Sequence, residues 1–358
     1  MTPRSPRNHR IRRCVAGAVA LLALTMPTLS TSSGASTHPR DTLHLSTPTA
    51  LRVIGTNLWV ANAGANSLSE LTSTGTLVRT VSGAKYHFST PRALAAVGTT
   101  LIVVNTSPSL TEINGVTGAL VRVITGTSYH LNRPVAALTI GTNLFVANEG
   151  NSTITEIDAT TGRLVRILTN APKGPLRFDG PVALASTSTS TTLWVANAVN
   201  SSVTVVKIAT GAVTSVLSSP TYDFSGLAGL AVNGADVWAT NSATDSVTEF
   251  NATTGAFVQN ITNSSLNANY GFNAPATVIS WQGFVYVVSP PGTSPMVTQL
   301  QATTGDANWM MCNTNYAFNF LGPASLAILQ GNLWVANAAN NTLTEMDATT
   351  GVLIQDVS

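Results

Sequence analysis

One short phrase recurs seven times along the chain and constrains its fold more than any other feature. The clearest copy, residues 333–351, reads LWVANAANNTLTEMDATTG. The glycines that close the copies are Gly75, Gly118, Gly162, Gly211, Gly255, Gly305 and Gly351. Since a period of about 40–50 residues is typical of propeller blades, the repeat favours a β-propeller over a helical solenoid.

Each repeat has the pattern of four short strands. An apolar run after a proline comes first, followed by the LWVAN strand, a polar loop and a third strand. An Asp-Ala-Thr-Thr-Gly turn then leads to the fourth strand, and its glycine suits a backbone with positive φ. Four strands joined by hairpin turns describe a propeller blade. We therefore expect an all-β fold, a seven-bladed β-propeller of four-stranded antiparallel blades.

The expected propeller domain spans residues 43–358, with repeats that start near positions 48, 91, 134, 181, 227, 275 and 323. The first repeat begins with its own first strand, and the last ends with its own fourth strand. No strand is left to complete a blade from the other terminus. The ring should therefore close by face-to-face packing of the first and seventh blades, unless residues 42–46 add a strand.

Residues 1–35 have the pattern of a cleaved signal peptide, and residues 36–42 of a short linker. Five arginines and no acid precede an apolar run that is too short to span a bilayer comfortably; an uncleaved signal anchor is the alternative. Of 17 basic residues five leave with the signal, so the mature net charge is 12 − 15 = −3. We expect a secreted or cell-surface protein with no membrane span after cleavage and no nucleic-acid partner.

Cleavage of the signal also removes Cys14, one of the two cysteines of the chain. Cys312 is then expected to lack a disulfide partner.

The repeated phrase Trp-Val-Ala-Asn-x-x-x-Asn-Thr-Leu-Thr-Glu-x-Asp-x-Thr-Thr-Gly resembles the YVTN family of β-propeller repeats, whose relatives include NHL-type propellers. The resemblance covers essentially the whole mature chain. It implies a propeller that is often exported or surface-associated. It implies no activity, because propellers host binding proteins, lyases, lactonases and scaffolds alike.

Five glutamates share one position in the third strand, and an arginine or glutamine lies four residues past the repeat glycine in the same repeats. The five pairs are Glu70 with Arg79, Glu112 with Arg122, Glu156 with Arg166, Glu249 with Gln259 and Glu345 with Gln355. We expect cross-strand pairs worth ~0.2–1 kcal/mol each, with a ring of catalytic acids as the alternative. Exchanging Glu156 and Arg166 should cost little if the two residues simply face each other.

The aromatic residues of the second strand are expected to pack between neighbouring blades. They are Trp59, Phe145, Trp194, Trp238, Tyr286 and Trp334. Trp281 and Trp309 break the repeat and are freer candidates for recognition. In the divergent sixth repeat, residues 309–312 read WMMC. They indicate either random sequence drift or an apolar contact surface.

An asparagine closes the second strand in six of the repeats. Hydrogen bonds to the following loop are the expected role, and a polar ring open to a ligand is the alternative. His44, His87 and His130 occupy one equivalent position in the connections that lead to the first three blades. Zinc needs its ligand atoms within about 2.0–2.1 Å, and neighbouring blades hold equivalent positions farther apart. We therefore expect solvated histidines, no metal and no cofactor.

The remaining acids indicate where a ligand would bind. Glu149 and Asp245 lie in loops between second and third strands, and Asp179 and Asp223 lie in connections between blades. In a propeller these loops share one face, so the four acids and His130 form the predicted ligand-binding arc.

We expect an exported, non-enzymatic and monomeric module that recognises or scaffolds a protein or polysaccharide on this face. One alternative is a metal-dependent lyase or lactonase that uses the same arc, although we find no catalytic motif. A second alternative is a component of a cell-surface lattice.

Overall fold

The computed structural model describes residues 43–170, 177–187, 191–218, 220–265, 270–290, 295–313 and 318–358. The predicted signal peptide and linker, residues 1–42, lie outside the described residues.

Seven four-stranded sheets make up the described chain. Blades 1 and 2 contain β1 (Pro48–Ile54), β2 (Asn57–Asn62), β3 (Ser67–Leu71), β4 (Leu77–Val81), β5 (Pro91–Val97), β6 (Thr100–Asn105), β7 (Ser109–Asn114) and β8 (Leu120–Thr125). Blades 3 and 4 contain β9 (Pro134–Ile140), β10 (Asn143–Asn148), β11 (Thr153–Asp158), β12 (Leu164–Leu168), β13 (Pro181–Ser186), β14 (Thr192–Asn197), β15 (Ser202–Lys207) and β16 (Ala212–Leu217). Blades 5 and 6 contain β17 (Leu227–Asn233), β18 (Asp236–Asn241), β19 (Ser246–Asn251), β20 (Phe257–Thr262), β21 (Thr277–Trp281), β22 (Phe284–Ser289), β23 (Met296–Gln301) and β24 (Ala307–Cys312). Blade 7 contains β25 (Pro323–Leu329), β26 (Asn332–Asn337), β27 (Thr342–Asp347) and β28 (Leu353–Val357).

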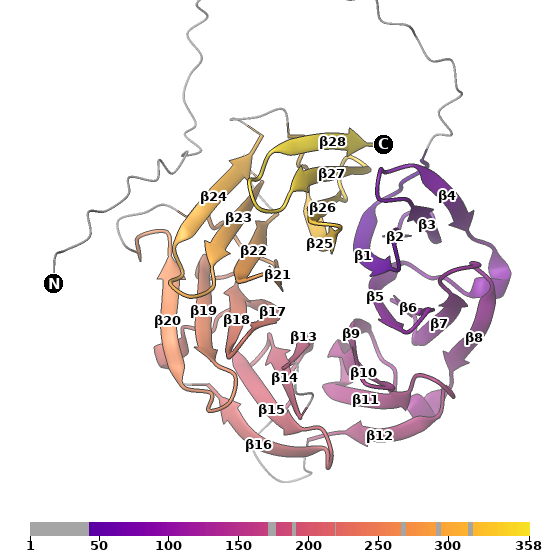
Figure 1. Cartoon of the computed structure of the whole chain (residues 1–358). Coiled ribbons are helices and arrows are strands. Elements are labelled where there is room, and N and C mark those ends of the chain that lie inside the picture. The colour runs from indigo at the N-terminus through magenta and orange to yellow at the C-terminus, as the bar shows by residue number, and fades with distance from the viewer. Residues whose placement is uncertain are drawn as a thin grey trace, which may run out of the picture.

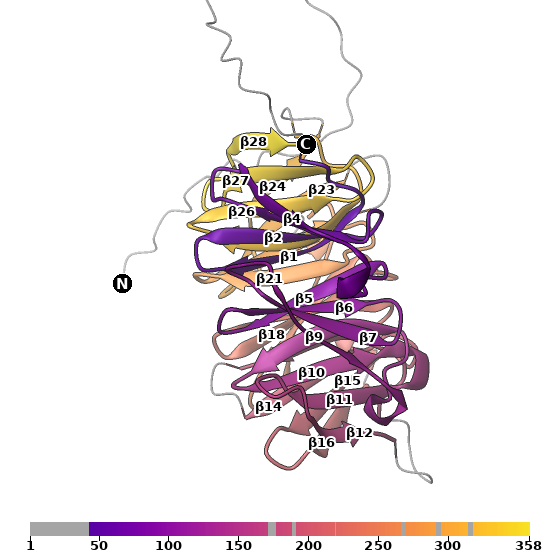
Figure 2. The same cartoon turned by 90° about the vertical axis from the view of Figure 1, so that its right-hand side faces the viewer.

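The sheets form a ring, with the first strand of each innermost and the fourth outermost (Figure 1). Figure 2 shows the same ring edge-on. Every sheet is antiparallel and pairs its strands in chain order. Single-turn 3-10 helices lie in the loops: η1 (Ala84–Tyr86), η2 (Thr127–Tyr129) and η4 (Pro220–Tyr222) precede blades 2, 3 and 5, and η3 (Glu149–Asn151) follows β10. The predicted seven-bladed β-propeller is confirmed.

The middle strands of each blade are buried on both faces because each sheet packs between two neighbours. The large second-strand aromatics fill these interfaces; Trp334, for example, packs against Leu58 and Val60 of blade 1. The expectation that these aromatics pack between blades is confirmed. Trp309 belongs to the same kind of interface, with only 7% of its surface exposed and its indole donating to Thr349 O at 3.1 Å. Its prediction as a recognition residue is therefore wrong, whereas Trp281 is half-buried.

The sixth blade offers no apolar contact surface through residues 309–312. Met310 and Cys312 are buried with Met296 in one small cluster. Cys312 is disulfide-bonded, contrary to the expected unpaired thiol, and Cys14 lies outside the described residues.

The ring closes between blades 7 and 1 without a shared strand. Residues 43–46 have no strand structure, and both sheets keep four strands of their own. Leu43 and Leu45 are buried in the interface with Trp334. The backbone N–H of Thr47 donates to Asn341 Oδ1 at 2.7 Å across the same interface. The expected closure by face-to-face packing is confirmed.

The glutamates of the third strands face their predicted partners. Glu70 pairs with Arg79 in the strand register, and the Nε–Oε2 distance is 2.7 Å. In blade 3 Glu156 is bonded by Arg166 on one side and by Asn143 Nδ2, at 2.6 Å, on the other. The five glutamates are 0–3% exposed, so these pairs are buried rather than solvated.

The partner residue also reaches the next blade. Arg166 Nη2 donates to Ile208 O at 2.8 Å, and Arg122 Nη2 donates to Thr160 O at 2.7 Å. An exchange of Glu156 and Arg166 would break these contacts and bury a guanidinium. We therefore expect the exchange to cost more than it would for two residues that only face each other.

The asparagines at the ends of the second strands hold the following loop. Asn148 Nδ2 donates to Thr153 Oγ1 at 3.2 Å and to Thr155 Oγ1 at 2.9 Å, and its Oδ1 accepts from Asn132 N at 3.4 Å. All six asparagines are fully buried: Asn62, Asn105, Asn148, Asn197, Asn241 and Asn337. The structural role is confirmed, and a ligand-binding ring of these amides is excluded by their burial.

Candidate functional site

Two kinds of segment meet on one side of the ring, here called the loop face: the β2–β3 type loops and the connections between blades. Hydrogen bonds join the loop of one blade to the connection that leads into the next. Asn66 Oδ1 accepts from Thr90 N at 2.6 Å, and Ser152 Oγ accepts from Gly180 N at 3.2 Å. The two segment types therefore share one face, as expected for a propeller.

The opposite side of the ring, the turn face, carries the repeated Asp-Ala-Thr-Thr-Gly turns. Asp158 Oδ1 accepts from Thr160 N at 2.9 Å and from Thr161 N at 2.8 Å. The Thr161 backbone hydrogen bond is the largest cause that lowers the pKa of Asp158. The polar groups at the start of these turns are thus used by their own backbone.

Two of the predicted ligand-binding acids have structural partners on the loop face. Asp245 Oδ1 accepts from Ala274 N at 2.7 Å, at the position where Asn66 bonds to Thr90 in blade 1. Asp223 Oδ2 accepts from Asn260 Nδ2 of β20 at 2.8 Å. Both carboxylates therefore help to hold the frame of the face.

The other two predicted acids are more available. Glu149 forms an exposed ion pair with Arg133 at 3.3 Å, with 29% of its side chain accessible. Asp179 is half-buried, and no described residue donates a hydrogen bond to its carboxylate. Glu149 and Asp179 thus remain the accessible acids of the predicted arc.

The three loop histidines are exposed and share a left-handed backbone. Their φ angles are 46° at His44, 54° at His87 and 51° at His130, and Asp223 and Gly271 have the same conformation at this position in later blades. A left-handed backbone accounts for the choice of His, Asp and Gly there. Among the described residues no group of three or more His, Cys, Asp or Glu could hold a metal ion.

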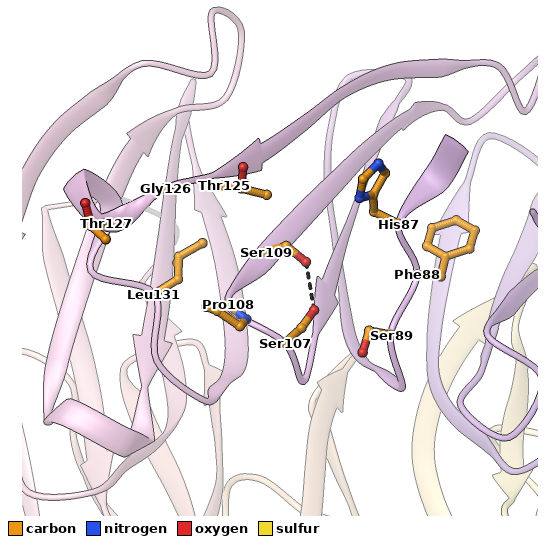
Figure 3. A pocket seen from close by; sticks show the side chains of 10 residues that line it. All are labelled: His87, Phe88, Ser89, Ser107, Pro108, Ser109, Thr125, Gly126, Thr127 and Leu131. Atoms are coloured by element: carbon orange, nitrogen blue, oxygen red, sulfur yellow. Dashed lines mark hydrogen bonds between the residues drawn. The ribbon is translucent and has the colours of Figure 1, made fainter. Parts of the chain in front are cut away.

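A cavity of about 550 Å³ opens on the loop face between blades 2 and 3. Figure 3 shows the Ser107–Ser109 loop with Leu131 and Thr127 on one side and His87 and Ser89 on the other. The remaining lining residues are Phe88, Pro108, Thr125 and Gly126. Its volume lies in the range of ~300–1,000 Å³ that is usual for small-molecule sites.

The cavity exists because the loop of blade 2 is short. Residues 106–108 separate β6 from β7, whereas four residues, 63–66, separate β2 from β3. The missing residue is the one with left-handed backbone, Asn66 in blade 1, that bonds to the next connection. No described side chain takes that role toward Arg133 N, and the space remains open. Sequence reasoning missed this site, although the one-residue difference is visible when the repeats are aligned.

The described residues form a seven-bladed β-propeller with a cavity on its loop face. Of the solved structures, the chain is similar to hydrazine synthase from Kuenenia stuttgartiensis, with a TM-score of 0.70 and 18% identity over 86% of this chain and 97% of that one. It is also similar to the computationally designed Ika8 protein, with a TM-score of 0.62 and 18% identity over 87% of each chain. At this identity the likeness shows the fold alone.

No family model and no curated protein matches the chain. Within the described ranges, no helix has the length and apolar character needed to cross a membrane.

Proposed function

We propose that this propeller is an exported, non-enzymatic recognition or scaffold module that binds a protein or polysaccharide on its loop face. The observation that carries the proposal is the contrast between the two faces. The turn face repeats one self-bonded turn, whereas the loop face holds a cavity of about 550 Å³ and side chains that differ from blade to blade. A binding site needs unlike groups that converge on one place.

The engagement of the loop-face acids favours binding over catalysis. Asp223 and Asp245 accept hydrogen bonds from neighbouring segments, and Glu149 is paired with Arg133. A metal-dependent lyase or lactonase would need several such groups directed at one ion, and the described residues bring no three of them together.

The proposed location and assembly rest on the sequence. The arginine-rich, acid-free start and the apolar run that follows support secretion or display at the cell surface. The repeated phrase supports a relationship to YVTN-type propellers. The mature net charge of 12 − 15 = −3 leaves no excess of basic residues, which supports a protein that does not bind nucleic acid. We propose that it acts as a monomer.

Co-sedimentation of the purified propeller with envelope material from the producing cells tests the proposal. We expect binding, and we expect Glu149→Ala with Asp179→Ala to weaken it. Asp158→Ala and Asp347→Ala on the turn face are the matched controls, because each removes a carboxylate from the other side of the ring. Binding that only the turn-face changes abolish would refute the assignment to the loop face. Absence of any binding, together with sedimentation of the protein as a large array, would favour a lattice component.

A further inference from the structure

The lining of the cavity between blades 2 and 3 indicates which class of ligand it binds. This inference rests on the proposed role of the loop face in recognition. Polar groups with free hydrogen-bonding capacity line it. In the described part of the chain, neither the His87 imidazole nor the hydroxyls of Ser89, Thr125 and Thr127 have a hydrogen-bond partner. A hydroxyl both donates and accepts, so this lining suits a ligand that does the same.

The floor of the cavity is held in place by the buried asparagine of blade 2. Asn105 Nδ2 donates to Ser109 Oγ at 3.2 Å, and Ser109 Oγ lies 3.0 Å from Ser107 Oγ. This bond holds the Ser107 side chain in place at the lining of the cavity. Its hydroxyl can therefore meet a ligand at little further cost in side-chain entropy.

Apolar surface complements these hydroxyls. Pro108, Phe88 and Leu131 contribute to the same lining. Leu131 is 7% exposed, and Phe88 is stacked on Tyr86 with 5.3 Å between ring centroids, so both are fixed by packing. Rigid apolar patches beside hydroxyls match the C–H faces and the hydroxyl rims of a sugar ring.

Charge narrows the ligand class further. None of the ten lining residues carries a carboxylate, an ammonium or a guanidinium group. With the imidazole of His87 neutral, as counted at pH 7, an ionic ligand would lose hydration on entering the cavity without gaining a counter-charge. We propose that this cavity binds a neutral sugar unit of a glycan.

Direct binding measurements on the whole protein test the proposal. The probes are neutral glucose, mannose and N-acetylglucosamine trisaccharides, a galacturonate trisaccharide, and a neutral peptide that contains proline and tyrosine. Saturation-transfer NMR and calorimetry should detect at least one neutral trisaccharide and no comparable signal from the acidic sugar. Preference for the acidic sugar or for the peptide would overturn the proposal, as would binding of none of them.

A substitution at the rim locates the site. Thr127 begins η2 and is exposed, so Thr127→Trp should block the cavity without disturbing the core. Ala84 begins η1 at the equivalent position, where Asn66 closes the interface between blades 1 and 2. We expect Thr127→Trp to weaken trisaccharide binding by about tenfold or more. Ala84→Trp should leave it unchanged, and equal effects of the two substitutions would overturn the assignment.

Lengthening the short loop is an independent test. Insertion of an asparagine between Pro108 and Ser109 restores the loop length of blade 1 and its bond to the next connection. The inserted protein should fold with an unchanged or higher melting temperature and lose trisaccharide binding. Retained binding would refute the cavity as the site. If a glycan still binds the loop face after both changes, this assignment fails while the proposed recognition role stands.

Discussion

The buried glutamates of the third strands differ in how many donors they have. Glu156 and Glu345 each accept from an asparagine at the start of the second strand, Asn143 and Asn332, as well as from their fourth-strand partner. In blade 2 that second-strand position is Thr100, which has no amide to donate. Burial raises the pKa of Glu112 to about 7, an effect that Arg122 only partly offsets.

The exchange Glu156→Arg with Arg166→Glu tests whether the pair is only a cross-strand contact. It would place a guanidinium where 1% of the side chain is exposed and remove the bonds from Asn143 and to Ile208 O. We expect a loss of about 3–5 kcal/mol in the free energy of unfolding, as for other buried pairs that are broken. Urea denaturation measures the loss, and a loss below ~1 kcal/mol would show that the pair is only a cross-strand contact.

The raised pKa of Glu112 predicts a pH dependence. Because the pKa in the folded protein exceeds that in the unfolded chain, protonated Glu112 stabilises the fold at low pH. This contribution is lost as the pH rises from about 4.5 through about 7. Relative to wild type, Glu112→Gln should therefore gain on the order of 2 kcal/mol between pH 5 and pH 8. Urea denaturation at both pH values measures the gain, with Glu156→Gln as the comparison.

A gain of the same size in Glu156→Gln would show that the effect does not depend on Thr100. A constant difference between wild type and Glu112→Gln would show that Glu112 does not titrate in this range.

At the scale of single residues, the sequence predicts which residues contact each other but not how far they are buried. The spacing of Glu70 and Arg79 around the turn indicates the strand register. Their burial depends on the two neighbouring blades, which no local pattern reveals. The same applies to Asp245, whose contact with Ala274 belongs to the next connection.

The repeated turn has a second role in joining the blades. Gly162 has φ +75°, and a Cβ there would lie 2.8 Å from Cδ of Arg122 in the preceding blade. Arg122 cannot move away freely, because Glu112 and Thr160 O hold its guanidinium. Gly118 has the same relation to Arg79, with 3.1 Å to its Cδ. The glycine is therefore required both by its backbone conformation and by the close approach of the neighbouring fourth strand.

Gly162→Ala separates these two requirements. We expect it to lower the free energy of unfolding by about 2–4 kcal/mol, since strain at positive φ and a clash with Arg122 add. Gly141→Ala is the control because its φ is +60° and nothing lies within 4 Å of the added carbon. Equal losses in the two variants, measured by chemical denaturation, would leave backbone strain as the whole effect.

The strands and their order follow from the repeat, since four apolar runs and hairpin turns leave few other topologies. The cavity between blades 2 and 3 could not be predicted in this way, because it arises from a missing residue rather than from a distinctive one. The loop 106–108 contains no group that chemistry would single out. The effect of the shorter loop is clear only by comparison with blade 1, where Asn66 of the longer loop bonds to the next connection.

At the scale of the whole molecule, the ring is closed by the packing of blade 7 against blade 1. Leu45 is 8% exposed within it, so Leu45→Ala should cost about 2–5 kcal/mol. Leu321→Ala, in the connection to blade 7 with 48% exposure, is the control and should change stability by less than ~0.5 kcal/mol. Thermal and urea unfolding compare the two. A Leu45→Ala protein as stable as the control would show that the ring holds without this contact.

The strand pairing of this ring does not depend on which blade the chain begins with. Each sheet is formed by four consecutive strands, and the ends of the described chain meet beside one another at blades 7 and 1 (Figure 1). Linking residue 358 to residue 43 and opening the chain at another connection between blades would preserve every strand pair. A circularly permuted chain should therefore form the same seven sheets, because no strand of the described chain has to pair in a distant blade.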